Sequence, residues 1–144
     1  MRIALVVSRY HDFVTSRLEA GARAALREAG VPETGVITFA VPGAYELAQA
    51  AHRLASTKEW HGIVCLGCLI RGETSHFDYI AQAAAHGIMR ASQDSGVPMG
   101  FGLLTTNTAE EALARAGDGP SNKGHEAATA LLAMTALYER IDHR

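Results

Sequence analysis

The stretch that decides the fold runs from residue 62 to residue 95. It consists of residues 62–70 (GIVCLGCLI), the loop 71–75 (RGETS), and the segment 76–95 (HFDYIAQAAAHGIMRASQDS). A short, nearly unbroken apolar run is typical of a strand buried on both faces of a parallel sheet. Residues 76–95 have the length of a long helix, and Gly96-Val97-Pro98 is a sequence that ends one. The stretch therefore predicts a strand–loop–helix unit of an α/β fold.

The same alternation extends to both ends of the chain. We expect further strands at 2–8, 35–41 and 99–105, and helices at 12–29, 44–55, 108–116 and 123–141. Thr108 is the expected N-cap of the short helix. Four apolar strands joined by helices require right-handed crossovers, so the sequence predicts a four-stranded parallel sheet with helices on both faces, a three-layer α/β sandwich.

Length and composition limit the classes of protein that are possible. The 144 residues suit one domain, 1–144, and 48% hydrophobic with 19% charged residues is typical of a globular domain. The net charge of -2 argues against a general nucleic-acid binder, and no apolar stretch is long enough to span a membrane. Two cysteines give no disulfide framework. We therefore expect a cytoplasmic protein with no nucleic-acid or membrane partner.

Several familiar motifs are incomplete in this chain. Cys65 and Cys68 have redox or zinc spacing, but within one strand they lie roughly 10 Å apart and point to opposite faces. Residues 67–74 imitate a phosphate-binding loop, but Glu73 stands where that motif needs lysine. Gly100-x-Gly102 lacks the third glycine of a dinucleotide fingerprint. The seven histidines include no pair at metal-ligand spacing, so no metal is expected.

Ligands of open parallel sheets bind beyond the carboxyl ends of the strands. Those ends are residues 8–13, 42–46, 68–76 and 105–108. Loop 72–76 joins a buried strand to a helix start, where free N–H groups bind anions, and Thr74 adds a hydroxyl. His76 stands at this helix start, and histidine is a side chain suited to proton transfer at neutral pH. The alternative is plain helix capping by Thr74 or Ser75, with His76 as an exposed first-turn residue.

Other candidates have similar alternatives. Glu46 can accept hydrogen bonds from a polyol or an amine, or can simply complement the start of a helix. Tyr10 and Phe101 can stack on a flat heterocycle, or pack in the core. Arg115 and Lys123 flank the glycine-rich loop 117–120 and can hold a phosphate, or can be solvated charges.

Four segments resemble the 6,7-dimethyl-8-ribityllumazine synthase family. They are residues 8–15 (SRYHDFVT), 41–46 (VPGAYE), 66–79 (LGCLIRGETSHFDY) and 122–128 (NKGHEAA). The resemblance implies a flavodoxin-like fold and a transferase of riboflavin biosynthesis. That enzyme condenses 5-amino-6-(D-ribitylamino)uracil with 3,4-dihydroxy-2-butanone 4-phosphate, releasing phosphate and water. It also implies that no cofactor or metal takes part.

The resemblance also assigns residues by motif match. His76 corresponds to the residue credited with proton transfer. The positions matched to the uracil substrate are Tyr10, Ala44, Tyr45, Glu46, Cys68, Leu69, Ile70 and Phe101. The positions matched to the butanone phosphate are Glu73, Thr74, Arg115 and Lys123. Tyr10 departs from the family's usual Phe or Trp, and Ala48 from a frequent Pro.

The resemblance further implies a homo-oligomer. Family members form pentamers, and some build shells of twelve pentamers, with Phe101 and Arg115 contributed by the neighbouring subunit. Two alternatives remain on the same scaffold. One is a flavin-binding, lumazine-binding or shell-forming protein with little turnover, which would give no lumazine fluorescence when both substrates are added. The other is a flavodoxin-like electron carrier, which would carry bound FMN.

Overall fold

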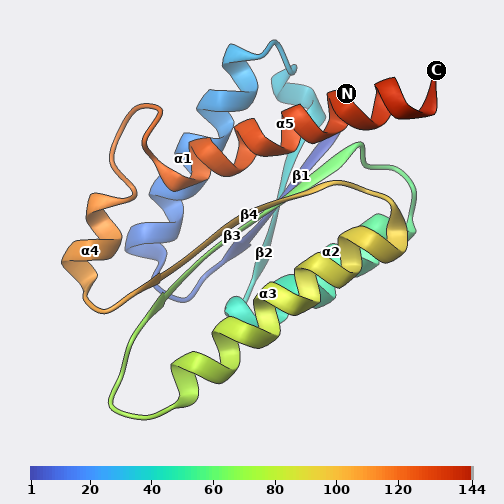
Figure 1. Ribbon diagram of the computed structural model, residues 1–144. Helices are drawn as coiled ribbons and strands as arrows, with labels where there is room; N and C mark the ends of the chain where they lie inside the picture. Colours follow the sequence, from blue (N-terminus) through green and yellow to red (C-terminus); the bar gives the residue numbers. More distant parts are fainter. Residues whose placement is uncertain (144) are drawn as a thin grey trace.

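A computed structural model describes residues 1–143 and shows one parallel sheet (Figure 1). Its strands are β1 (Ile3–Ser8), β2 (Val36–Val41), β3 (Gly62–Ile70) and β4 (Met99–Thr106), in the order β2-β1-β3-β4. All three pairings are parallel, so every strand directs its carboxyl end to the same edge. The order places β2 and β4 at the two sides of the sheet. The predicted four-stranded parallel α/β fold is confirmed.

Helices cover both faces of the sheet (Figure 1). Helices α1 (Asp12–Glu28) and α5 (Lys123–Asp142) pack together on one face, and α2 (Leu47–Ser56) packs with α3 (His76–Ser95) on the other. The short helix α4 (Ala109–Ala114) follows β4. Two single 3₁₀ turns, η1 (Glu33–Gly35) and η2 (Ala44–Glu46), precede β2 and α2. This is the expected three-layer arrangement.

Alternation along the strands divides the core between the two faces. In β1, Ile3 and Leu5 pack toward α1 and α5, whereas Ala4 and Val6 pack toward α2 and α3. All four are fully buried, as expected for a strand covered on both sides. The apolar run of β1 is nearly unbroken because its alternate residues fill the cores on the two faces of the sheet.

Local sequence signals set most of the helix ends. Thr108 forms a capping box with Glu111, and Gly96 ends α3 in the left-handed conformation, with φ of 75°. Two expected bounds differ from the structure by two or more residues, whereas the others agree to within one. The segment expected to be one helix over 44–55 begins as the turn η2, and α2 starts at Leu47. Helix α4 ends at Ala114 rather than at residue 116, because Arg115 is already its C-cap.

Cys65 and Cys68 lie on opposite faces of β3, as predicted, and both are free thiols. Burial raises the pKa of Cys65 to about 12 and that of Cys68 to about 11, so neither is a thiolate at neutral pH. Their contribution is to packing.

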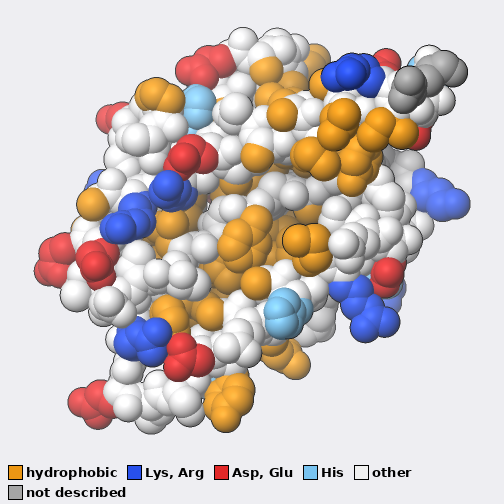
Figure 2. Space-filling model, in the orientation of Figure 1, with side chains coloured by type: hydrophobic (Ala, Val, Ile, Leu, Met, Phe, Trp, Pro, Cys, Tyr) orange, Lys and Arg blue, Asp and Glu red, His pale blue; other side chains and the backbone are white. Residues whose placement is uncertain are grey.

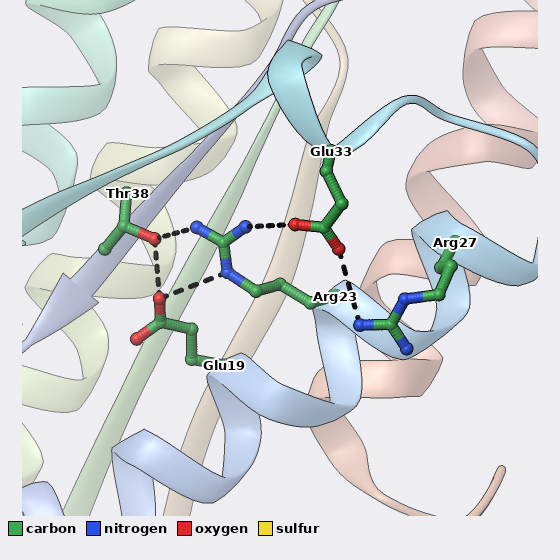
Figure 3. A network of polar contacts seen from close by, with 5 residues as sticks. All are labelled: Glu19, Arg23, Arg27, Glu33 and Thr38. Atoms are coloured by element: carbon green, nitrogen blue, oxygen red, sulfur yellow. Dashed lines mark hydrogen bonds and ion pairs between the residues drawn. The ribbon is translucent and has the colours of Figure 1, made fainter.

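A polar network fastens the edge strand β2 to α1 (Figure 3). Thr38 of β2 donates to Glu19 over 2.6 Å and accepts from Arg23 over 2.7 Å. Arg23 and Arg27 also form ion pairs with Glu33 in η1, at 3.6 and 3.4 Å. Because Glu19 and Arg23 are only partly exposed, these bonds hold the outer strand against the helix more firmly than a fully solvated ion pair would.

None of the helices within residues 1–143 is both long enough and apolar enough to cross a membrane.

Candidate active site

A cavity of about 730 Å³ opens at the carboxyl ends of β1, β2 and β3. Its wall consists of the residues that follow these strands and of the first turns of α3: Tyr10, His11, Gly43, Ala44, Tyr45, Glu46, Leu69, Ile70, Gly72, Thr74, His76, Phe77 and Ile80. This is the edge at which a parallel sheet was expected to bind a ligand. We call it the first cavity.

His76 is the first residue of α3 and is exposed to the first cavity. Its backbone N–H donates to the Thr74 hydroxyl at 3.4 Å, so the loop turns back on itself just before the helix. Ser75 occupies the N-cap position, but its side chain makes no capping hydrogen bond. Donors at this helix start are therefore available to an anion, with the helix dipole favouring negative charge there.

The turn η2 supplies a carboxylate to the opposite wall. The Glu46 backbone N–H donates to the Gly43 carbonyl at 3.2 Å, which closes the turn directly after β2. A Cβ atom at position 43 would lie 3.3 Å from Glu46 Oε1, so glycine leaves the carboxylate close access to the backbone. Ala44 is buried below it, while Tyr45 is 55% exposed. The turn therefore fixes the backbone of Glu46, whose side chain lines the cavity.

Aromatic groups line the side of the cavity next to β1. Tyr10 is 64% exposed and its ring lies 4.4 Å from that of His11, centroid to centroid. His11 packs edge-on against Phe13, with 5.8 Å between the ring centroids. A flat ligand therefore meets an exposed aromatic ring at this wall.

His11 is a cavity residue that the sequence analysis did not select. It adopts the left-handed conformation, with φ of 61° and ψ of 48°, at the N-cap of α1. That conformation is uncommon for residues other than glycine, although histidine adopts it more readily than most. Burial lowers the pKa of His11 from its ordinary 6.5, so the ring is neutral at pH 7. Its signal in the sequence was its position after β1, directly after Tyr10.

Phe101, Arg115 and Lys123 lie elsewhere, around a second cavity of about 630 Å³ between β4 and α5. Phe101 pairs with Cys65 in the sheet, four residues before the Leu69–Thr105 pair at the carboxyl end. Four strand residues span roughly 13 Å. Within one subunit these three side chains therefore line a different cavity from His76.

Asn122, next to Lys123 in the sequence, fixes the start of α5. Its side chain accepts from the N–H groups of Gly124 and His125, at 2.8 and 3.1 Å, and so caps α5. It also donates to the carbonyls of Arg17 and Gly117, at 3.1 and 2.9 Å. The buried asparagine thereby fixes the start of α5 against α1 and against the glycine-rich loop.

Backbone contact then brings the two cations of the second cavity together. The Lys123 N–H donates to the Arg115 carbonyl at 2.9 Å. Lys123 forms an ion pair with Glu126 at 2.8 Å, whereas Arg115 Nη1 donates to the carbonyl of Glu111 at 3.0 Å. Arg115 is exposed and its charge is not neutralised by that carbonyl, so its guanidinium is the better placed of the two to bind an anion.

Two further predicted residues do not line either cavity. Cys68 is 1% exposed and packs in the core below Leu69 and Ile70. Glu73 lies in the exposed loop before α3, outside the residues that line the first cavity. The Cys68 side chain is therefore enclosed in the core, whereas the Glu73 side chain is exposed outside the first cavity. Among residues 1–143, no three His, Cys, Asp or Glu side chains are grouped as metal ligands.

The fold and the first cavity define a parallel α/β enzyme with a small-molecule site at the carboxyl edge of its sheet. Residues 1–139 match the family model described as 6,7-dimethyl-8-ribityllumazine synthase. The chain is also 43% identical, over 141 residues, to the 6,7-dimethyl-8-ribityllumazine synthase of Syntrophus aciditrophicus (strain SB). The match covers 98% of this chain and 92% of the relative.

The chain belongs to the 6,7-dimethyl-8-ribityllumazine synthase family. Its activity is the lumazine synthase reaction of riboflavin biosynthesis, a transferase reaction on small-molecule substrates.

Proposed function

We propose that the first cavity holds both substrates of this reaction side by side and that His76 transfers the protons. One observation carries the proposal: an imidazole, a hydroxyl at a helix start, a carboxylate and an exposed aromatic ring line the same cavity. Each group suits a different part of the two substrates. Holding two reactants in contact can itself lower the barrier by several kcal/mol, about 7 or more in the best-oriented cases.

The uracil substrate fits the wall formed by β1, β2 and β3. Its flat ring stacks on Tyr10, and the partly buried Leu69 and Ile70 offer backbone groups to the ring edge. Cys68 contributes through its backbone as well, since its side chain is in the core. The ribityl chain lies along η2, where Ala44 and Tyr45 leave room and Glu46 accepts hydrogen bonds from hydroxyl groups.

The butanone phosphate fits the start of α3. The phosphate accepts hydrogen bonds from the Thr74 hydroxyl and from the N–H groups of loop 72–76, including that of Glu73, while the Glu73 carboxylate faces solvent. Arg115 and Lys123 of a neighbouring subunit complete the phosphate site. A forked guanidinium and aligned N–H groups stabilise a leaving phosphate without a metal.

The reaction needs several proton transfers, and His76 suits them. The amino group of the uracil substrate attacks the ketone, and loss of water gives an imine. Phosphate then leaves, and the ring closes with loss of another water. The imidazole of a histidine can alternately accept and donate protons in these steps. Its place at the start of α3 puts it next to the phosphate site.

We further propose that the site is shared between subunits of a ring of at least five copies. Phe101, Arg115 and Lys123 border a cavity separate from that of His76, and a head-to-tail contact would bring it to a neighbour's first cavity. Hydrophobic side chains gather on this side, over β4 and between α5 and α3 (Figure 2). Met89, Phe101 and Met134 are exposed there. An apolar surface of this kind is typical of a subunit contact.

Steady-state kinetics of two variants test these roles. We expect His76→Ala to lower kcat by roughly 10- to 1,000-fold, the usual range for one acid–base group or slightly below it. We expect Arg115→Ala to raise the KM of the butanone phosphate by roughly 10- to 150-fold, because a charge-assisted contact contributes about 1.5–3 kcal/mol. An unchanged kcat in the first variant, or equal KM changes for both substrates in the second, would refute the respective role.

A further inference from the structure

Arg71 is the first residue after β3 and has a role that the substrate contacts do not include. Its backbone N–H continues the sheet by donating to the Thr106 carbonyl at 2.8 Å. Its Nε donates to Asn107 Oδ1 at 3.2 Å, on the segment that follows β4. Arg71 thus joins the ends of the two strands that precede α3 and α4.

The other end of the guanidinium reaches α3. Nη1 and Nη2 donate to the two carboxylate oxygens of Asp78, at 3.4 and 3.3 Å, in a forked arrangement. The guanidinium carbon also lies 4.4 Å from the ring centroid of Phe77, which is a cation–π contact. Phe77 is mostly buried and lines the first cavity. One side chain therefore contacts the two residues that directly follow His76.

These contacts close the loop that carries Thr74 and His76. The loop leaves β3 at Arg71 and returns to the same side chain at Phe77 and Asp78. Residues 72–76 are exposed between these two points. The place of His76 is thus fixed from its C-terminal side by Phe77 and Asp78.

We propose that Arg71 is a positioning residue for loop 71–76, and that it sets the place of the His76 ring through the first turn of α3. The proposal rests on the proposed role of His76. Arg71 is not a substrate ligand, because its Nε and both Nη atoms already donate to Asn107 and Asp78. Arg115, in contrast, uses one Nη atom on a backbone carbonyl.

The proposal predicts a particular kinetic effect. Arg71 and Asp78 are 46% and 49% exposed, so their ion pair contributes little to overall stability. A small displacement of a catalytic group, in contrast, strongly reduces turnover. Changes at Arg71 should therefore affect kcat much more than the melting temperature.

Arg71→Lys is the most informative variant, because lysine keeps the charge but cannot bind Asp78 and Asn107 together. We expect kcat to fall by roughly tenfold, with little change in the KM of the uracil substrate or in Tm. The control is Arg90→Lys. It changes another arginine–aspartate pair, the exposed Arg90–Asp94 pair, which lies on α3 like Asp78. We expect the control to behave as the parent enzyme.

A double-mutant cycle identifies the residue through which Arg71 acts. With His76→Ala already present, Arg71→Lys should lower kcat no further, because the ring that it positions is gone. An equal loss of kcat with and without His76 would overturn the proposal, as would an unchanged kcat in Arg71→Lys alone.

Hydrogen exchange tests the anchoring of the loop independently of turnover. The amides of residues 72–78 should exchange faster in Arg71→Lys than in the parent enzyme or in Arg90→Lys. Unchanged exchange would overturn the proposal. If His76→Ala has full activity while the amides still exchange faster, the role of His76 in proton transfer fails and the anchoring by Arg71 stands.

Discussion

Mixing two impaired variants tests whether each site is built by two subunits. His76→Ala removes the proposed proton-transfer group of the first cavity, and Arg115→Ala removes one of the two cations of the second cavity. The two side chains border different cavities of one subunit. If a site joins the first cavity of one subunit to the second cavity of its neighbour, mixed rings contain some sites with both groups intact.

The arrangement of the two cavities gives the size of this effect. A site is intact when its first cavity belongs to an Arg115→Ala subunit and its second cavity to a His76→Ala subunit. In randomly mixed rings at equal amounts, this holds for about one quarter of the sites. If one variant makes up a fraction f, the intact share is f(1 − f), or about 19% at a ratio of one to three. Activity should therefore follow a parabola in f.

The assay uses co-expressed subunits with different affinity tags. Tandem purification isolates mixed rings, native mass spectrometry gives their composition, and lumazine fluorescence follows the reaction. With the butanone phosphate well below its wild-type KM, where a raised KM lowers the rate in full, we expect roughly one quarter of the wild-type rate per subunit at equal amounts, above either parent variant. A straight line between the two parent activities, in rings shown to be mixed, would refute a shared site. A fully active monomer would do the same.

Two further predictions concern stability. Gly124→Ala should destabilise the protein by about 2–3 kcal/mol, because its Cβ would overlap the backbone carbonyl of Leu18 where α5 crosses α1. Chemical denaturation measures this, and Gly117→Ala, whose Cβ meets no atom within 4 Å, is the control, which we expect to change stability little. For His11, burial lowers the folded-state pKa below 6.5, so its contribution to stability is present above pH 6.5 and decreases as pH falls from there through the folded-state pKa. His11→Asn should flatten this part of the stability–pH profile, since asparagine also accepts the left-handed conformation, and an unchanged profile would contradict it.

The sequence by itself determined the elements and the edge at which the site forms. Apolar runs predicted all four strands, and Gly96 correctly predicted the end of α3 at Ser95. These features depend on local properties, namely strand burial, helix capping and backbone conformation, which neighbouring residues encode. The same logic placed Glu46, Thr74 and His76 at the carboxyl edge of the sheet, where they line one cavity.

The tertiary structure decided which of the candidates lie together. The family resemblance assigned Phe101 and Arg115 to the neighbouring subunit, but only the structure shows that they share a second cavity with Lys123, because β4 and α5 place them there. The reason is geometric: the distance between residues far apart in sequence depends on sheet order and helix packing. No local pattern contains that information.

The same holds for the residues found from the structure. His11 gave no signal of its own beyond its position after β1, and its lowered pKa arises from burial by the folded chain. Arg71 was part of the motif in residues 66–79, but its partner Asn107 is 36 residues away in sequence. Motif and periodicity predict whether a segment is a strand, a loop or a helix. The contact between Arg71 and Asn107 forms only because the sheet places the ends of β3 and β4 side by side.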